Sequence, residues 1–198
     1  RSGRLSAPGA AARGVGFTPK GEPPLYASLE VAGVPRTAPA PDKSVIDIER
    51  KYFTTDGKPW VGGTLAEGDA LIVQVNVQAS RPMPDALLTD LLPAGLEIEN
   101  FNLGDGKQWA GVVIDGIELS DRDDAAEVRH EEFRDDRYVA ALKLDVGDTA
   151  RVFYLVRAVT PGTYTVPPSL VEDMYRPELR GVGKVLPATL TVTQPGAK

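Results

Sequence analysis

The feature that most constrains the fold of this chain is an alternation of apolar and polar side chains in residues 71–79. The two sets are Leu71, Val73, Val75, Val77 and Ala79 on one side, and Gln74, Asn76 and Gln78 on the other. Successive side chains of a β-strand point to opposite faces, so this period of two is typical of a strand with one buried face. The stretch therefore predicts a half-buried strand and a β class of fold.

Other short apolar runs continue this pattern along the chain, separated by turn residues. We expect strands at 87–92 and 96–101 around a proline-containing turn, DLLPAG, at 90–95. Residues 150–159 are apolar on both faces, which indicates a strand in the centre of its sheet. A closing strand is expected at 186–192, with inward-facing Leu186, Ala188, Leu190 and Val192. The pattern predicts an all-β fold, an antiparallel two-sheet β-sandwich.

Length and composition limit the class of protein. A chain of 198 residues can bury a core of its own. The formal net charge of −6 argues against nucleic-acid binding, which needs a basic face. No apolar run approaches the roughly 18 residues of a membrane-spanning helix. Cysteine is absent, which excludes disulfides, thiol catalysis and thiolate metal sites within this chain.

The first forty residues differ from the rest. Residues 1–22 are rich in Gly, Ala, Pro and Ser, and such a segment buries too little to offset its ordering entropy. A lone strand is expected at 25–31, followed by a proline-rich linker. We therefore expect two parts: a flexible tail with its strand and linker at 1–41, which belongs to a preceding domain, and the sandwich at 42–195. No signal peptide is expected at Arg1, and the abrupt start is typical of a fragment or processed product.

Candidates for catalytic or metal chemistry are few. His130 is the only histidine, and a single imidazole without partners makes neither a triad nor a metal site. The acidic stretch 115–136 is rich in the carboxylates that calcium prefers, but it lacks the alternating ligands and central glycine of a calcium loop. A solvated acidic loop is the default interpretation of this stretch.

Two further patterns are weaker. Trp60 and Trp109 could line a carbohydrate cleft, although two tryptophans more often pack at the ends of a sandwich. The turn at 104–106, Gly-Asp-Gly, lacks the following helix of a phosphate-binding loop. We therefore expect no catalytic residue, no metal site and no cofactor in this chain.

The stretch at 171–181, VEDMYRPELRG, has no apolar period and is rich in charge. One interpretation is an irregular crossover between the last two strands, with Met174 and Tyr175 tucked into the rim of the core. The other is a docking surface for a neighbouring domain, because Tyr and Arg combine large contact area with a polar group. On that second interpretation, the candidate interface residues are Met174, Tyr175, Arg176, Glu178 and Arg180.

Three blocks, read in order, resemble a known family. LLPAGLEIEN at 91–100, EEFRDDRYVAAL at 131–142 and the long block at 154–181 closely resemble the C-terminal part of bacterial α2-macroglobulins. The resemblance implies an immunoglobulin-like macroglobulin sandwich, the last one (MG10), in the position of the animal receptor-binding domain. Family members are large secreted or periplasmic lipoproteins of bacterial defence. A protease cleaves their bait region and is then trapped, often through a thioester.

The resemblance also sets the expected function. The thioester motif CxEQ needs a cysteine, so this chain cannot form that bond. We expect a non-enzymatic module of a bacterial endopeptidase inhibitor that braces the thioester-type domain, with the other domains of the parent as partners. Target proteases would be met through the parent, which would be periplasmic and membrane-associated only through lipidation. The alternative is a sandwich module that binds an envelope protein partner or serves adhesion, through an exposed edge strand.

Overall fold

The computed structural model of the chain describes residues 37–99, 109–121 and 127–194, and also Thr18, Gly21 and Tyr26. The chain divides into two compact units, Arg1–Thr37 and Ala38–Lys198, and the fold described below is that of the second. The expected flexible tail and the lone strand at 25–31 lie outside the described residues. They stay predictions, as does the division into parts at 1–41 and 42–195.

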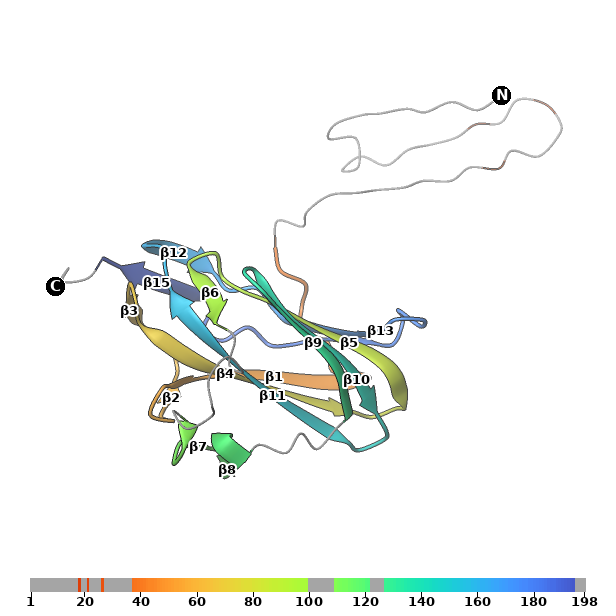
Figure 1. The fold of residues 1–198 in the computed structure, drawn as a ribbon. Coiled ribbons are helices and arrows are strands. Elements are labelled where there is room, and N and C mark those ends of the chain that lie inside the picture. The colour runs from red at the N-terminus through yellow and green to blue at the C-terminus, as the bar shows by residue number, and fades with distance from the viewer. Residues whose placement is uncertain are drawn as a thin grey trace. The chain divides into compact units, whose positions relative to one another are not determined.

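Two five-stranded antiparallel sheets form the body of the second unit (Figure 1). The first has the order β2-β1-β4-β11-β6, made of Pro59–Trp60, Ile46–Thr54, Ala70–Ala79, Thr149–Ala158 and Leu96–Glu99. The second has the order β14-β13-β5-β10-β9, made of Arg180–Val182, Ser169–Asp173, Met83–Leu91, Arg137–Leu144 and Glu127–Arg134. The predicted antiparallel two-sheet β-sandwich is confirmed.

Two smaller elements complete the unit. A three-stranded sheet has the order β12-β15-β3, with bounds Gly162–Thr165, Thr189–Thr193 and Thr64–Ala66. Its β15–β3 pair is parallel, which the sequence patterns did not predict. A short hairpin of β7 (Val113–Ile114) and β8 (Ile117–Glu118) precedes a single 3-10 turn at Leu119–Asp121.

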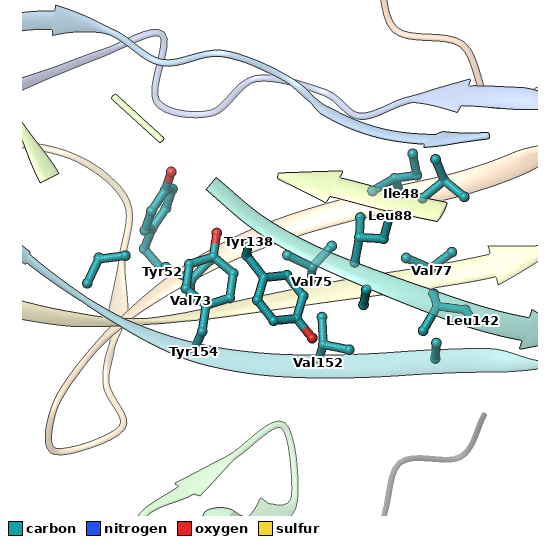
Figure 2. Close-up of a cluster of buried hydrophobic side chains, with 14 of the residues drawn as sticks. Ile48, Tyr52, Val73, Val75, Val77, Leu88, Tyr138, Leu142, Val152 and Tyr154 are labelled. Carbon is teal, nitrogen blue, oxygen red and sulfur yellow. The ribbon is translucent and has the colours of Figure 1, made fainter. Parts of the chain in front are cut away.

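One continuous apolar core fills the space between the two large sheets. The inward set of β4 is buried as its alternation predicts: Leu71, Val73, Val75, Val77 and Ala79. Figure 2 shows Leu88 of β5 and Leu142 of β10, two strands of the second sheet, among the side chains of this core. Burial of each such leucine or valine contributes about 1.5–3 kcal/mol, so this layer is the main stabilising feature of the sandwich.

Strand β11 is buried on both faces, as predicted for a central strand. Val152 and Val156 point into the sandwich, whereas Phe153 and Leu155 belong to a second apolar cluster on the outer face of the same sheet. The segment at 109–121 covers that outer face through Trp109, Ile114 and Leu119, and the cluster also holds Phe53 and Ile72. The outer face of the first sheet is therefore dry at this end, and Gln74 of β4 is buried there as well.

Two predicted boundaries need correction. Strand β5 continues to Leu91, so the turn begins after it rather than at Asp90, whose carboxylate is held inside the sandwich. The closing strand begins at Thr189 rather than Leu186, which is 58% exposed. Pro187 explains the second difference, because it has no N–H to donate to a strand ladder.

Candidate functional site

The stretch at 171–181 folds as a hairpin at the edge of the second sheet, so the prediction of an irregular crossover is wrong. Strands β13 and β14 pair in register, with Val171 opposite Gly181 and Glu172 opposite Arg180. A Cβ at Gly181 would lie 2.3 Å from Cγ2 of Ile46 and 2.6 Å from its carbonyl oxygen. Glycine at this position lets β14 approach the start of β1, and the residues between the strands form the docking loop, defined here as residues 174–179.

The docking loop presents the side chains of Met174 and Tyr175 to solvent. Tyr175 is 77% exposed and Met174 is 48% exposed, so neither is tucked into the rim of the core as one interpretation predicted. The other three candidates, Arg176, Glu178 and Arg180, are exposed as well. The structure thus places all five residues on one hairpin and leaves them accessible, while the docking role itself stays a prediction.

The carboxylate of Asp173, at the base of the docking loop, organises its first turn. One oxygen, Oδ1, accepts hydrogen bonds from the backbone N–H groups of Tyr175 at 3.0 Å and Arg176 at 2.9 Å. The other, Oδ2, accepts bonds from the Arg176 guanidinium, at 2.5 Å from Nη2 and 3.2 Å from Nε. The hydrogen bonds from Arg176 hold the pKa of Asp173 below its ordinary value, against the opposing effect of burial.

Backbone bonds close the rest of the docking loop. The N–H of Leu179 donates to the carbonyl of Arg176 at 2.8 Å, and the N–H of Asp173 donates to the carbonyl of Leu179 at 2.9 Å. The N–H of Met174 donates to the carbonyl of Asp85 on the neighbouring strand at 3.0 Å. The loop is therefore built of regular hydrogen bonds, and its thioether and phenol side chains suit apolar contact with a polar group at one end.

A buried polar network, which the sequence reasoning missed, joins the two sheets. Nη1 of Arg50 lies 2.6 Å from Oδ1 of Asp90, and Nη2 donates to the carbonyl of Pro167 at 2.6 Å. The hydroxyls of Tyr154 and Ser169 donate to the same carboxylate, at 2.5 and 2.8 Å. The sequence signal for it was Arg50 itself, a cation on the apolar side of the β1 alternation.

Electrostatics in this network favour the charged form of Arg50 and the neutral forms of Tyr52 and Tyr154. Burial by itself lowers the pKa of Arg50, but the Asp90 carboxylate, with smaller contributions from Tyr52 and Tyr154, raises it further than burial lowers it. Burial raises the pKa of Tyr52 to about 12, and it raises the pKa of Tyr154 as well, with the Asp90 charge acting in the same direction. These groups keep one protonation state near neutral pH, which suits a structural cross-link rather than proton transfer.

The remaining chemistry candidates occupy separate places. His130 is exposed on β9, with Nε2 3.4 Å from Oε1 of Glu132. The acidic stretch at 115–136 is only partly described, and the turn at 104–106 lies outside the described residues. Within the described ranges, no three His, Asp or Glu side chains gather as metal ligands.

The two tryptophans also lie apart. Trp109 is buried in the cluster on the outer face, whereas Trp60 packs edge-on against Tyr52 with ring centroids 5.8 Å apart. Trp60 is on the wall of a groove beside β1, about 1180 Å³ in volume, which Lys51 and Glu49 also line. Charges of both signs line the groove. The docking loop is the candidate site that the structure describes most completely.

Comparison with known proteins shows the family to which this chain is similar. Residues 46–178 match the family model described as the Bacterial Alpha-2-macroglobulin MG10 domain. An alpha-2-macroglobulin of Xylella fastidiosa (strain 9a5c) is 66% identical over 193 residues, which is 98% of this chain and 12% of that relative. Native alpha-2-macroglobulin of Escherichia coli, solved from domain MG7 to the C-terminus, is 43% identical with a TM-score of 0.70. That match covers 81% of this chain and 25% of the other.

A second solved structure agrees. Escherichia coli alpha-2-macroglobulin activated by porcine elastase is 42% identical with a TM-score of 0.70, covering 81% of this chain and 14% of that one. The chain thus spans a small part of the length of its relatives. The matched range runs from the start of β1 into the docking loop and so includes every strand of the two large sheets except β14, and it confirms the resemblance that the residue blocks indicated. The chain belongs to the family of bacterial alpha-2-macroglobulin MG10 domains.

Proposed function

We propose that this chain is a non-enzymatic module of a bacterial protease-trapping inhibitor, and that its docking loop braces a neighbouring domain of the parent protein. Membership of the MG10 family supports the first half of the proposal. One Escherichia coli relative is activated by porcine elastase, which supports proteases as the targets that the parent meets. The brace would lie near the thioester-type domain, shielding it until the parent changes shape.

The observation that carries the brace is the exposure of Met174 and Tyr175 on a loop whose backbone is already hydrogen-bonded. Exposed large apolar side chains on a rigid loop are typical of contact surfaces, because little conformational freedom remains to be lost on docking. The charged neighbours Glu178 and Arg180 would form the polar rim of such a contact.

Location and membrane association follow from the same proposal. We place the parent in the periplasm, anchored by lipidation, with its own other domains as the immediate partners of this chain. The described residues contain no helix of the length and apolarity that crossing a bilayer requires. Any membrane association in this proposal is therefore assigned to the lipid of the parent.

The test is made in the full-length parent, with Met174→Ala and Tyr175→Ala combined. We expect protease trapping, measured as protease retained per inhibitor, to fall several-fold, and the first thermal transition of the parent to shift to lower temperature. The same double variant of this chain alone should keep its stability within about 0.5 kcal/mol, since both side chains are exposed.

Val113→Ala is the matched control, because Val113 is an exposed apolar residue on the separate β7–β8 hairpin. It should leave trapping and heat stability unchanged. Unaltered trapping together with unaltered heat stability in the Met174/Tyr175 variant would rule out the brace. Specific capture of an envelope protein by the wild-type chain, lost in that variant, would instead favour the adhesion module.

A further inference from the structure

We infer that Asp173 and Arg176 are positioning residues that hold the docking loop in one preformed shape, and that Met174 and Tyr175, rather than Arg176, make its contact with the neighbouring domain. This inference rests on the proposed docking role for its functional meaning. It changes the role predicted for Arg176, from a residue that touches a partner to one that acts through the loop.

The first step is the burial and hydrogen bonding of Asp173. Its side chain is only 1% exposed, although a carboxylate is costly to remove from water without compensation. Two backbone N–H groups and one guanidinium supply that compensation, through both carboxylate oxygens. A charged acceptor makes stronger bonds than a neutral one, so the turn that contains Tyr175 is fixed in place.

The second step concerns the guanidinium of Arg176. Besides Asp173, its Nη2 donates to the carbonyl of Pro82, 3.2 Å away and directly before β5. Arg176 thus connects the docking loop to the segment directly before β5, the neighbour of β13 in the sheet. A guanidinium that makes these bonds within its own domain would have to break them to reach a partner, whereas Met174 and Tyr175 need no rearrangement.

The third step is a pH dependence with a defined sign. The pKa of Asp173 is lowered from its ordinary value of 3.8, chiefly by the bonds from Arg176. Groups with a lowered folded pKa stabilise the structure above their ordinary pKa, and this contribution is lost as the pH falls through the folded value. Other charged groups also lie near the loop. The hydrogen bond with Asp173 has the largest effect in raising the pKa of Arg176, and the charges of Glu178 and Asp85 raise it further. Arg129 pairs with Asp85 at 3.4 Å.

Hydrogen exchange in this chain tests the inference directly. The amides of Tyr175 and Arg176 should lose roughly tenfold of their protection in Asp173→Asn, which corresponds to the loss of one charge-assisted hydrogen bond. In the wild type, protection corrected for intrinsic exchange should fall as the pH is lowered below 3.8, the ordinary pKa of an aspartate, whereas in Asp173→Asn it should be low and independent of pH. The amide of Val75 in the central strand β4 serves as an internal reference for global unfolding.

The control is Glu172→Gln, which removes a carboxylate from the exposed side of the same strand. Protection at Tyr175 that is unchanged in Asp173→Asn, or equally reduced in Glu172→Gln, would overturn the positioning role. The double variant of Met174 and Tyr175 in the parent tests the docking role separately. Suppose that Asp173→Asn reduces protection while the Met174/Tyr175 variant of the parent keeps its trapping and heat stability. The positioning role then stands and the proposed brace fails.

Discussion

At the scale of single residues, both carboxylates that are buried in the described part of the chain, Asp90 and Asp173, have structural roles. Asp90 joins the two sheets from inside the core, and Asp173 fixes the docking loop at the edge. Buried ion pairs contribute little net stability relative to apolar replacements of equal size, but removing one partner leaves the other charge without compensation. This asymmetry gives a clear prediction for Arg50 and Asp90.

We expect Arg50→Ala to lower the free energy of unfolding by about 3–5 kcal/mol, since it leaves the Asp90 carboxylate buried beside two hydroxyl donors. Replacing both partners together, as Arg50→Met with Asp90→Leu, should be much milder than the sum of the two single changes. Urea unfolding followed by fluorescence measures the wild type, Arg50→Ala, the single variants Arg50→Met and Asp90→Leu, and the double variant. An additive double variant would show that the pair is not coupled.

At the scale of elements, strands with long alternating runs could be predicted and short charged ones could not. Strand β4 shows its two faces in its sequence, and β11 shows a second buried face through Phe153 and Leu155. Strand β14 has three residues, Arg180–Val182, and its existence depends on the close approach that Gly181 allows. A period of two cannot be recognised in three residues, so this hairpin was missed.

The candidate site divides in the same way. Exposure of Tyr175 could be anticipated from the charged residues on both sides of it. Burial of Asp173 could not, because a carboxylate is ordinarily exposed and its three donors come from the folded loop and not from a sequence pattern. The parallel pairing of β15 with β3 was equally hidden, since it joins segments far apart in the chain.

The connection from β11 to β12 provides a prediction at the same scale. The hydroxyl of Tyr164 donates to the carbonyls of Thr160 at 3.0 Å and Pro161 at 3.1 Å, and its ring lies on Gly95. A Cβ at Gly95 would lie 2.2 Å from the ring. Gly95→Ala should therefore destabilise the domain by about 1–3 kcal/mol in urea unfolding.

A double-mutant cycle provides the control for Gly95. In a Tyr164→Ala background the added methyl group has no ring to displace, so Gly95→Ala should cost much less there. An equal cost in both backgrounds would assign the effect to the backbone of Gly95 rather than to its contact with Tyr164.

At the scale of the whole molecule, the incoming chain and the docking loop meet the same edge of the second sheet. Asp42 exchanges two backbone hydrogen bonds with Val182, at 3.0 and 2.8 Å. Val182 is the last residue of β14, the second strand of the hairpin that carries the loop. This contact covers an otherwise open edge strand. The docking loop and the segment around Asp42 therefore lie at the same edge of the module.

This arrangement predicts where the folded module can be cut. A chain that starts at Ala38 should unfold with the same free energy as the full chain, since it keeps the pair between Asp42 and Val182. A chain that starts at Ser44 loses both hydrogen bonds and uncovers β14, and we expect it to be about 1–3 kcal/mol less stable in urea unfolding. Exchange should increase at the amide of Val182 in the shorter chain alone, while the amide of Val75 in β4 changes only as far as global stability does. Equal stability of the two shortened chains would show that the edge needs no cover, and the folded boundary would then lie after residue 43 rather than at the predicted position before Asp42.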